Sequence, residues 1–349
     1  MKRILHFIPD TAGGGAEVVS RIIANHQRSH YEVHFASFST PALGFEGIIY
    51  HQIVKHRGLL GAIRSRMQVR EIIKRVDPDA VLSHLTFMNV IVSLSRGMYL
   101  KRTPHILVHH SSNIEYRNRF VRFIVKYIYL RSNVVAVSDD VGRYLVQELH
   151  LKKNLVIPNP VELQISDHPI GKNTGIPKSR LLAVGRLSEE KNYSFLLQSL
   201  LVLPKKFTLD IFGSGNIDSL MSEIAALGLS DRVKMRGFIP QDQLQIFMKE
   251  FDFFVMTSNF EGESLSLLQA AAKGLLVIGR DTPGLGNSVR KVGGFLPENS
   301  SSPESFARAI LKADEIGRNS LPAYSWASTH DPALASHKYC LLIDELLNG

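Results

Sequence analysis

The stretch Asn259–Gly274 constrains the fold more than any other part of the sequence, because it lies between two short apolar runs. The first run is Phe253–Met256 and the second is Leu275–Ile278. This pattern predicts a buried strand, a loop, a helix and a second buried strand, in that order. In open parallel sheets, the loop that leaves the carboxyl end of a strand lines the ligand crevice. The stretch therefore predicts both an α/β sheet and the edge of that sheet where a ligand binds.

The helix of this crossover is expected to begin at Ser264 or Leu265, just after Gly262. Its free N–H groups and a partial charge of about +0.5 would point into the crevice and favour an anion. Glu261 lies directly ahead of that anion site, where a carboxylate is better suited to accept hydrogen bonds from hydroxyl groups. Hydroxyls beside a phosphate indicate a sugar nucleotide. The apolar positions of the helix would, however, pack on any sheet, so a purely structural crossover remains an alternative at this point.

The second half of the chain repeats the same alternation, which predicts a doubly wound sheet. Expected strands are 181–184, 208–212, 233–235, 253–256, 275–279 and 294–296. Arg186 and Lys191 follow the first of these strands and flank the start of the next helix. Two cations beside helix amides suit a diphosphate, although either cation alone would be an ordinary surface charge.

The first half is expected to form a second sheet of the same kind. Its proposed strands are 3–8, 79–84 and 133–138, with a further strand that runs out into a polar loop within 105–112; the segment 154–161 closes this half, and the polar segment 164–179 is expected to be a linker. A glycine turn containing Gly14 and Gly15 joins the first strand to a helix that runs toward His26. Asp77-Pro78-Asp79 matches the metal-binding motif Asp-x-Asp, but its proline favours a turn that leads into the next strand.

Charge is distributed unevenly between the two halves. Residues 1–170 carry 22 Lys and Arg against 13 Asp and Glu, whereas the remainder carries 19 against 19. A basic half joined to a neutral half predicts two domains with different partners, and anionic lipid, a phosphorylated acceptor and nucleic acid all suit the basic half. The segment 117–131 mixes apolar, aromatic and cationic residues, so it is either a buried helix with snorkelling arginines or an interfacial helix.

Several classes of protein are disfavoured by the composition. Cys340 is the only cysteine, no apolar run is long enough to span a membrane, and no signal peptide follows Met1. We therefore expect a cytoplasmic protein that associates with the inner face of the cell membrane. Nucleic acid is not expected as a partner, because the chain has no docking motif and no interleaved exposed aromatics.

The stretch around Glu261 resembles the signature of retaining GT-B glycosyltransferases of family 4. In that signature two glutamates separated by seven residues flank the helix start; Glu261 matches the first, and Gln269 replaces the second. The Gly-Arg-Leu…Lys-Asn pattern at 185–192, the Phe-Gly-Ser-Gly turn at 212–215 and the Arg-Gly-Phe triplet at 236–238 recur in the family in this order. The resemblance covers most of residues 1–300.

The resemblance implies a GT-B fold, in which two Rossmann-like domains face each other across a cleft. Residues 1–165 would bind the acceptor, 166–179 would be the linker and 180–332 would bind the nucleotide sugar, while a helix at about 333–349 would pack back on the first domain. His110, Arg186, Lys191 and Glu261 would be catalytic. The nucleotide sugar would contact Gly14, Gly15, Gly185, Gly213, Gly237, Phe238, Gly262, Ser264, Leu265 and Gln269.

The implied reaction is the retaining transfer of a hexosyl or N-acetylhexosaminyl group without a metal or other cofactor. The donor would be a nucleoside-diphosphate sugar, with UDP favoured over GDP. The acceptor would be a saccharide, lipid-linked or of the lipopolysaccharide, capsule or O-antigen type. A non-catalytic partner subunit of the same fold, which binds a glycan or a nucleotide sugar, is the alternative.

Overall fold

The computed structural model describes residues 1–11, 14–41, 44–56, 58–95, 103–112, 119–152, 154–162, 179–316, 326 and 329–348. The chain divides into two compact units. Unit 1 comprises Met1–Glu162 with His330–Gly349, and unit 2 comprises Leu163–Thr329. The segment expected to be a linker lies almost wholly outside the described residues.

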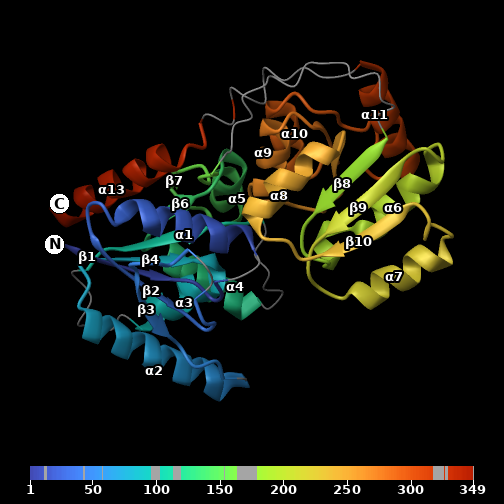
Figure 1. The fold of residues 1–349 in the computed structure, drawn as a ribbon. Coiled ribbons are helices and arrows are strands. Elements are labelled where there is room, and N and C mark those ends of the chain that lie inside the picture. Colours follow the sequence, from blue (N-terminus) through green and yellow to red (C-terminus); the bar gives the residue numbers. More distant parts are fainter. Residues whose placement is uncertain are drawn as a thin grey trace. The chain divides into compact units, whose positions relative to one another are not determined.

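Unit 1 is built on a parallel sheet in the order β3-β2-β1-β4-β5-β6-β7 (Figure 1). The strands are β1 (Arg3–Phe7), β2 (Glu32–Ser37), β3 (Ile49–Gln52), β4 (Ala80–His84), β5 (His105–His109), β6 (Asn133–Ala136) and β7 (Leu155–Val156). All residues of β4 and β5 are buried, as expected for strands covered on both faces. The strand order reverses between β1 and β4, and in such sheets this switch point is where ligands bind.

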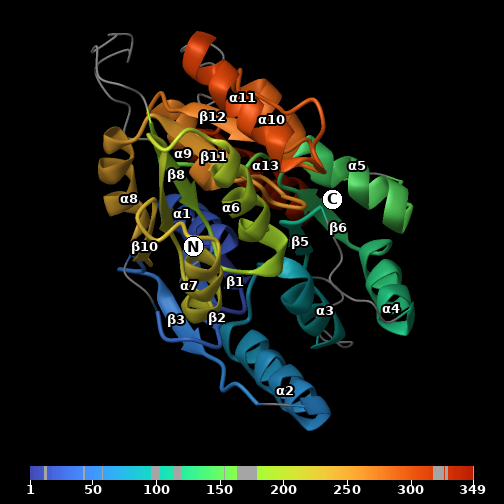
Figure 2. The same cartoon turned by 90° about the vertical axis from the view of Figure 1, so that its right-hand side faces the viewer.

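The helices of unit 1 cover both faces of the sheet. They are α1 (Gly15–Gln27), α2 (Gly58–Val76), α3 (Leu85–Ser95), α4 (Arg119–Tyr129), α5 (Asp139–Leu149) and α13 (Pro332–Asn348). Helix α2 packs against α3 (Figure 2), and α13 returns from the end of the chain to pack on α1. Buried side chains of α2 and α3, among them Ile73 and Met88, share one core with Leu5 and Val81 of the strands.

Unit 2 contains a second parallel sheet in the order β10-β9-β8-β11-β12. Its elements are β8 (Arg180–Val184), the 3-10 turn η2 (Glu189–Lys191), α6 (Tyr193–Val202), β9 (Thr208–Phe212), α7 (Ile217–Ala226), β10 (Val233–Gly237), α8 (Gln241–Phe247), the 3-10 turn η3 (Met248–Glu250), β11 (Phe253–Met256), α9 (Leu265–Ala272), β12 (Leu276–Gly279), α10 (Leu285–Lys291) and α11 (Pro303–Ile316).

Alternate residues of β8 enter different cores on the two faces of this sheet. Leu181 packs with residues of α6, α7 and α11, whereas Leu182 packs with residues of α8, α9 and α10. The fold class predicted from the sequence is therefore confirmed: both units are doubly wound parallel sheets.

One expected strand is absent, and the segment that closes the first half pairs only briefly. The run 154–161 forms only β7, because Pro158 and Pro160 cannot donate to a ladder. The run 294–296 forms no strand and makes a single bridge, between Phe295 and Ile278. Gly293, with φ of +68°, turns the chain just before that bridge, and Pro297 follows it. Proline or glycine therefore ends the backbone pairing of both runs.

Candidate functional site

The carboxyl ends of β8 and β9 meet at a point that only glycine can occupy. A Cβ on Gly213 would lie 1.9 Å from the carbonyl oxygen of Gly185. The backbone N–H of Gly185 donates to Phe212 O at 3.0 Å, and that of Gly213 donates to Gly237 O at 2.8 Å. The three glycines expected to approach the nucleotide therefore lie on neighbouring strand ends. Phe238, which follows Gly237, is an exposed aromatic side chain at the same edge.

Lys191 and Glu261 form an ion pair at this edge, although 70 residues separate them. Lys191 Nζ donates to Glu261 Oε1 at 2.6 Å, and the hydroxyl of Ser258 donates to the same oxygen at 2.6 Å. Both charged side chains are largely withdrawn from water, with 17% and 11% of their surface exposed. A short charge-assisted pair of this kind holds each partner in one orientation.

The backbone around Glu261 is also fixed. Its N–H donates to Pro283 O at 2.9 Å. A Cβ on Gly284, where φ is +78°, would lie 1.9 Å from Glu261 O, so the neighbouring turn requires glycine. Burial and the Glu261 carboxylate raise the pKa of Tyr193, whose hydroxyl donates to Gly185 O at 3.0 Å.

The loops after β8 and β11 are joined by hydrogen bonds that the sequence did not reveal. Thr257 Oγ1 donates to the carbonyl oxygens of Lys191 and Asn192, at 3.1 and 3.0 Å. Asn259 N donates to Glu190 O at 2.8 Å, and Arg280 Nη1 donates to the Asn259 side chain at 2.9 Å. The polar run that begins at Thr257, directly after a buried strand, was the available signal for these residues.

Arg186 does not join the Lys191–Glu261 pair. Its guanidinium Nη2 donates to Glu190 Oε1 at 2.8 Å, and 61% of its side chain is exposed. Such an exposed pair contributes little to stability and leaves the guanidinium able to change partners.

Helix α9 begins where the sequence predicted. Ser264 is its N-cap, and the Ser264 hydroxyl accepts from the backbone N–H of Leu267 at 3.3 Å. Gly262, two residues before the cap, is buried. Gln269 lies one turn along α9 from Leu265 and is 2% exposed. Among the described residues, its side-chain oxygen Oε1 has no hydrogen-bond partner.

In unit 1, three of the expected site residues lie in the segments that follow β1 and β5. Gly14 is the N-cap of α1, and a Cβ there would lie 2.1 Å from the Glu17 carboxylate; Gly15 is the first residue of the helix. His110 follows the end of β5, and its Nε2 lies 3.2 Å from Nδ1 of the buried His84. Burial, with a smaller contribution from His109, lowers the pKa of His110 to about 3, so its ring is neutral at physiological pH.

The two aspartates of Asp77-Pro78-Asp79 both accept hydrogen bonds from Arg3. Asp79 Oδ2 accepts from Arg3 N at 2.7 Å, and Asp77 Oδ2 accepts from Arg3 Nη2 at 3.3 Å. The two carboxylates thus fasten the turn before β4 to the start of β1. Within the described ranges, no group of three or more His, Cys, Asp and Glu side chains could hold a metal ion.

Helix α4 lies at the outside of unit 1 beside α5 (Figure 2), to which the Arg122–Glu148 ion pair joins it at 2.9 Å. Residues 117 and 118 of the expected helix lie outside the described residues. The apolar residues Phe120, Phe123, Tyr127 and Leu130 are exposed on α4 and directly after it. No helix in the described part of the chain is long and apolar enough to cross a membrane.

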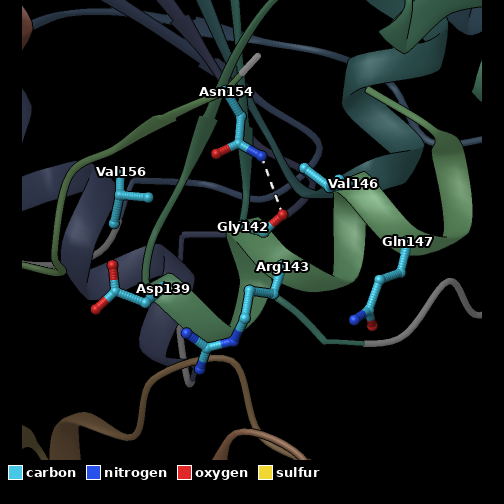
Figure 3. Close-up of a pocket in the computed structure, with 7 residues that line it drawn as sticks. All are labelled: Asp139, Gly142, Arg143, Val146, Gln147, Asn154 and Val156. Carbon is cyan, nitrogen blue, oxygen red and sulfur yellow. Dashed lines mark hydrogen bonds between the residues drawn. The ribbon is translucent and has the colours of Figure 1, made fainter. Parts of the chain in front are cut away.

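A shallow pocket of about 340 Å³ lies elsewhere on unit 1, between α5 and β7 (Figure 3). Its lining includes Asp139, Arg143 and Gln147 of α5, and the Asn154 amide, which donates to Gly142 O at 3.0 Å. None of the residues expected from the sequence to be functional lines it.

Two family models match consecutive parts of this chain. The model described as Glycosyltransferase Family 4 matches residues 13–165, and the model described as Glycosyl transferases group 1 matches residues 170–320. This chain is a family 4 glycosyltransferase. The resemblance inferred from the motifs around Arg186 and Glu261 is therefore confirmed.

Individual relatives agree with the family. The glycosyltransferase is 22% identical to the amylovoran biosynthesis glycosyltransferase AmsK of Erwinia amylovora, over 73% of this chain and 66% of AmsK. It is 24% identical to the alpha-monoglucosyldiacylglycerol synthase of Streptococcus pneumoniae, over 65% of this chain and 57% of that protein. These names favour an enzyme over a non-catalytic partner subunit.

The fold also matches solved structures. Anabaena HepE in complex with UDP-glucose aligns with a TM-score of 0.80 and 20% identity, over 99% of this chain and 100% of that chain. At this identity the comparison shows the fold alone, and that fold is GT-B.

Proposed function

We propose that this glycosyltransferase moves a hexosyl or N-acetylhexosaminyl group from a UDP-sugar to a saccharide acceptor, with retention of configuration and without a metal. The observation that carries the proposal is the Lys191–Glu261 pair, held at 2.6 Å beside the N-terminus of α9. One edge of the sheet thus carries a cation, a carboxylate and free helix amides. Together these groups suit a diphosphate bonded to a sugar. UDP-glucose in the structure of HepE supports a UDP-sugar as the donor.

Some of these residues would stabilise the leaving group, and others would hold the sugar. When the bond between sugar and phosphate breaks, negative charge grows on the leaving diphosphate; Lys191, Arg186 and the first N–H groups of α9 stabilise it. In comparable sites a fixed donor of this kind lowers the barrier by about 2.7–4 kcal/mol. Glu261 and His110 accept hydrogen bonds from the sugar hydroxyls. The acceptor hydroxyl attacks the anomeric carbon from the face that the diphosphate leaves, and its proton passes to the departing diphosphate.

Gln269 is proposed to bind the ribose. A buried oxygen without a partner costs about 1–3 kcal/mol, so a ligand hydroxyl that donates to Oε1 would be favoured. As the side chain is packed, solvent does not reach this atom, and ribose binding therefore requires the amide to rotate.

Residues 1–165 are proposed to bind the acceptor and residues 180–332 the donor. The relatives support a saccharide acceptor, lipid-linked or part of a surface polysaccharide, because one is named for amylovoran biosynthesis and another for a glucosyldiacylglycerol. The exposed apolar residues of α4 and its cations support peripheral contact with an anionic leaflet.

Slow hydrolysis of the donor tests the stereochemistry without knowledge of the acceptor, because water then takes the acceptor's place. Proton NMR of the freshly released sugar, recorded before it mutarotates, should show the anomeric configuration of the donor. The inverted anomer as the first product would contradict the retaining mechanism.

The same hydrolysis assay should proceed unchanged in EDTA. Activity that is lost in EDTA and restored by Mg²⁺ or Mn²⁺ would contradict the metal-free proposal.

A further inference from the structure

Three histidines and one glutamine form a continuous chain of contacts inside unit 1. Gln27 Oε1 lies 2.8 Å from His6 Nε2, His6 Nδ1 lies 3.3 Å from His84 Nε2, and His84 Nδ1 lies 3.2 Å from His110 Nε2. Gln27, His6 and His84 are all fully buried. We call these four residues the histidine relay. It begins in α1, crosses β1 and β4, and ends at the only half-buried member, His110.

The register of the sheet produces this alignment. His6 of β1 is paired with Leu82 of β4, and His84 lies two residues further along, so both side chains lie on one face. His84 is in turn paired with Val108 of β5, and His110 again lies two residues further along. The rings of His6 and His84 are nearly parallel, with an interplanar angle of 12°. Gln27 reaches the same face from the last turn of α1.

Each imidazole in the relay is neutral. Burial lowers the pKa of His6 to about 4 and that of His110 to about 3, and it lowers the pKa of His84 well below the ordinary value. A neutral imidazole carries one N–H and one lone pair, so it can donate through only one of its nitrogens. Consecutive hydrogen bonds must therefore all run in the same direction.

In the amide orientation of this structure, the carbonyl oxygen of Gln27 faces His6, and because Oε1 can only accept, it sets that direction. His6 donates to it from Nε2 and must accept at Nδ1 from Nε2–H of His84. His84 must then accept at Nδ1 from Nε2–H of His110. His110 is left with a lone pair on Nδ1.

We propose that Gln27 fixes the tautomer of His110 through His6 and His84, so that Nδ1 of His110 is kept as a hydrogen-bond acceptor. Gln27, His6 and His84 are thus positioning residues. That the group held by Nδ1 is a hydroxyl of the donor sugar rests on the proposed function; the tautomer itself does not.

The competing arrangement is a relay that runs the other way. A primary amide turned by 180° would donate to His6 Nε2, and each imidazole would then carry its proton on Nδ1. In the orientation described here the Nε2 atom of Gln27 is buried without a partner among the described residues, and in the turned amide Oε1 would take its place. Both arrangements therefore leave one amide atom unpaired, and the two predict opposite tautomers.

Two-bond ¹H–¹⁵N correlation spectra of the ¹⁵N-histidine-labelled, ligand-free protein separate the tautomers. We expect the Nε2–H form at His6, His84 and His110, each signal being assigned by its loss in a His→Phe variant. In Gln27→Met, His6 Nε2–H loses its acceptor; the relay should reverse, and His110 should change to the Nδ1–H form. Ser20→Ala, which removes another buried polar group of α1 outside the relay, should leave all three signals unchanged.

The proposal would be overturned by Nδ1–H or mixed tautomers in the wild-type protein, or by a folded Gln27→Met variant in which His110 is unchanged. If that variant does not fold, the wild-type tautomers decide the matter. A second readout is the catalytic efficiency: Gln27→Met should lower kcat/KM about tenfold, the worth of one hydrogen bond, and should have no further effect in a His84→Phe background. Because the spectra need no ligand, a failure of the proposed function would not disturb them.

Discussion

Lys191 and Glu261 hold each other in place through one short contact, which the hydroxyl of Ser258 reinforces on the same carboxylate oxygen. The residue types could be predicted, because each follows the carboxyl end of a buried strand, where ligands bind in parallel sheets. Their contact at 2.6 Å could not, since it depends on how two loops 70 residues apart pack together. Ser258, which donates to the same carboxylate oxygen, was missed for the same reason.

Removal of either cation should slow turnover and leave the fold intact. Lys191→Ala and Arg186→Ala are each expected to lower the rate of donor hydrolysis at saturating donor by about 10²–10³, the cost of one lost donor to a developing anion. Lys206→Ala is the matched control, because Lys206 forms an ordinary surface pair with Asp314 at 3.1 Å in the same unit. Rates close to wild type in both site variants would disprove their role at the leaving group.

Substitutions of Gln269 test where the ribose lies. Gln269→Glu should tighten the binding of a nucleoside diphosphate by about 1 kcal/mol, because a charged acceptor makes a stronger hydrogen bond than a neutral one. Gln269→Leu should weaken it by more, whereas Glu261→Gln should damage turnover and leave this binding nearly unchanged. Calorimetric titration separates these outcomes. If neither Gln269 variant alters the dissociation constant, the residue only packs α9 against the sheet.

At the scale of elements, strands and helices with clear boundaries were predictable and interrupted ones were not. The sequence predicted the start of α9 because a serine precedes an apolar helical run, and Ser264 indeed caps that helix. The strand expected at 294–296 did not form, because the glycine turn before it and the proline after it limit pairing more strongly than its apolar residues favour it. The histidine relay could not be predicted from the sequence, because it depends on the register between β1, β4 and β5.

Helix α4 provides a test of membrane contact. The wild-type protein should sediment with phosphatidylglycerol-containing vesicles more than with pure phosphatidylcholine vesicles, because apolar side chains and cations act together. Phe120→Ser with Phe123→Ser should reduce this binding severalfold, since both rings are more than half exposed, at 69% and 64%. The control pair Met221→Ser and Ile246→Ser removes exposed apolar residues of unit 2. Equal loss in both pairs would mean that α4 has no special role.

At the scale of the whole molecule, the uneven distribution of histidine predicts that the two units respond differently to acid. Twelve of the 14 histidines lie in residues 1–170, and unit 2 contains only His168. Burial lowers the pKa of His6 and His109 to about 4. Because the unfolded chain binds these protons near the ordinary pKa of 6.5, it holds more protons than the folded state between about pH 6.5 and about pH 4.

Unit 1 should therefore lose stability as the pH falls through that window. Each unit of pKa difference corresponds to about 1.4 kcal/mol, so the loss should be several kcal/mol near the acid end. Hydrogen exchange measured by mass spectrometry, with intrinsic rates corrected for pH, should show protection lost in β1, β4 and β5 and kept in β8 and β11. Equal loss of protection in both sheets would contradict this assignment.

We propose that this family 4 glycosyltransferase uses a nucleotide sugar held by unit 2. One panel of UDP-, GDP- and ADP-sugars tests this, with thermal shift and slow release of the nucleoside diphosphate measured on the same purified protein. We expect UDP-sugars to raise the melting temperature and one of them to be hydrolysed to UDP and free sugar. A protein that neither binds nor hydrolyses any member of the panel would contradict it.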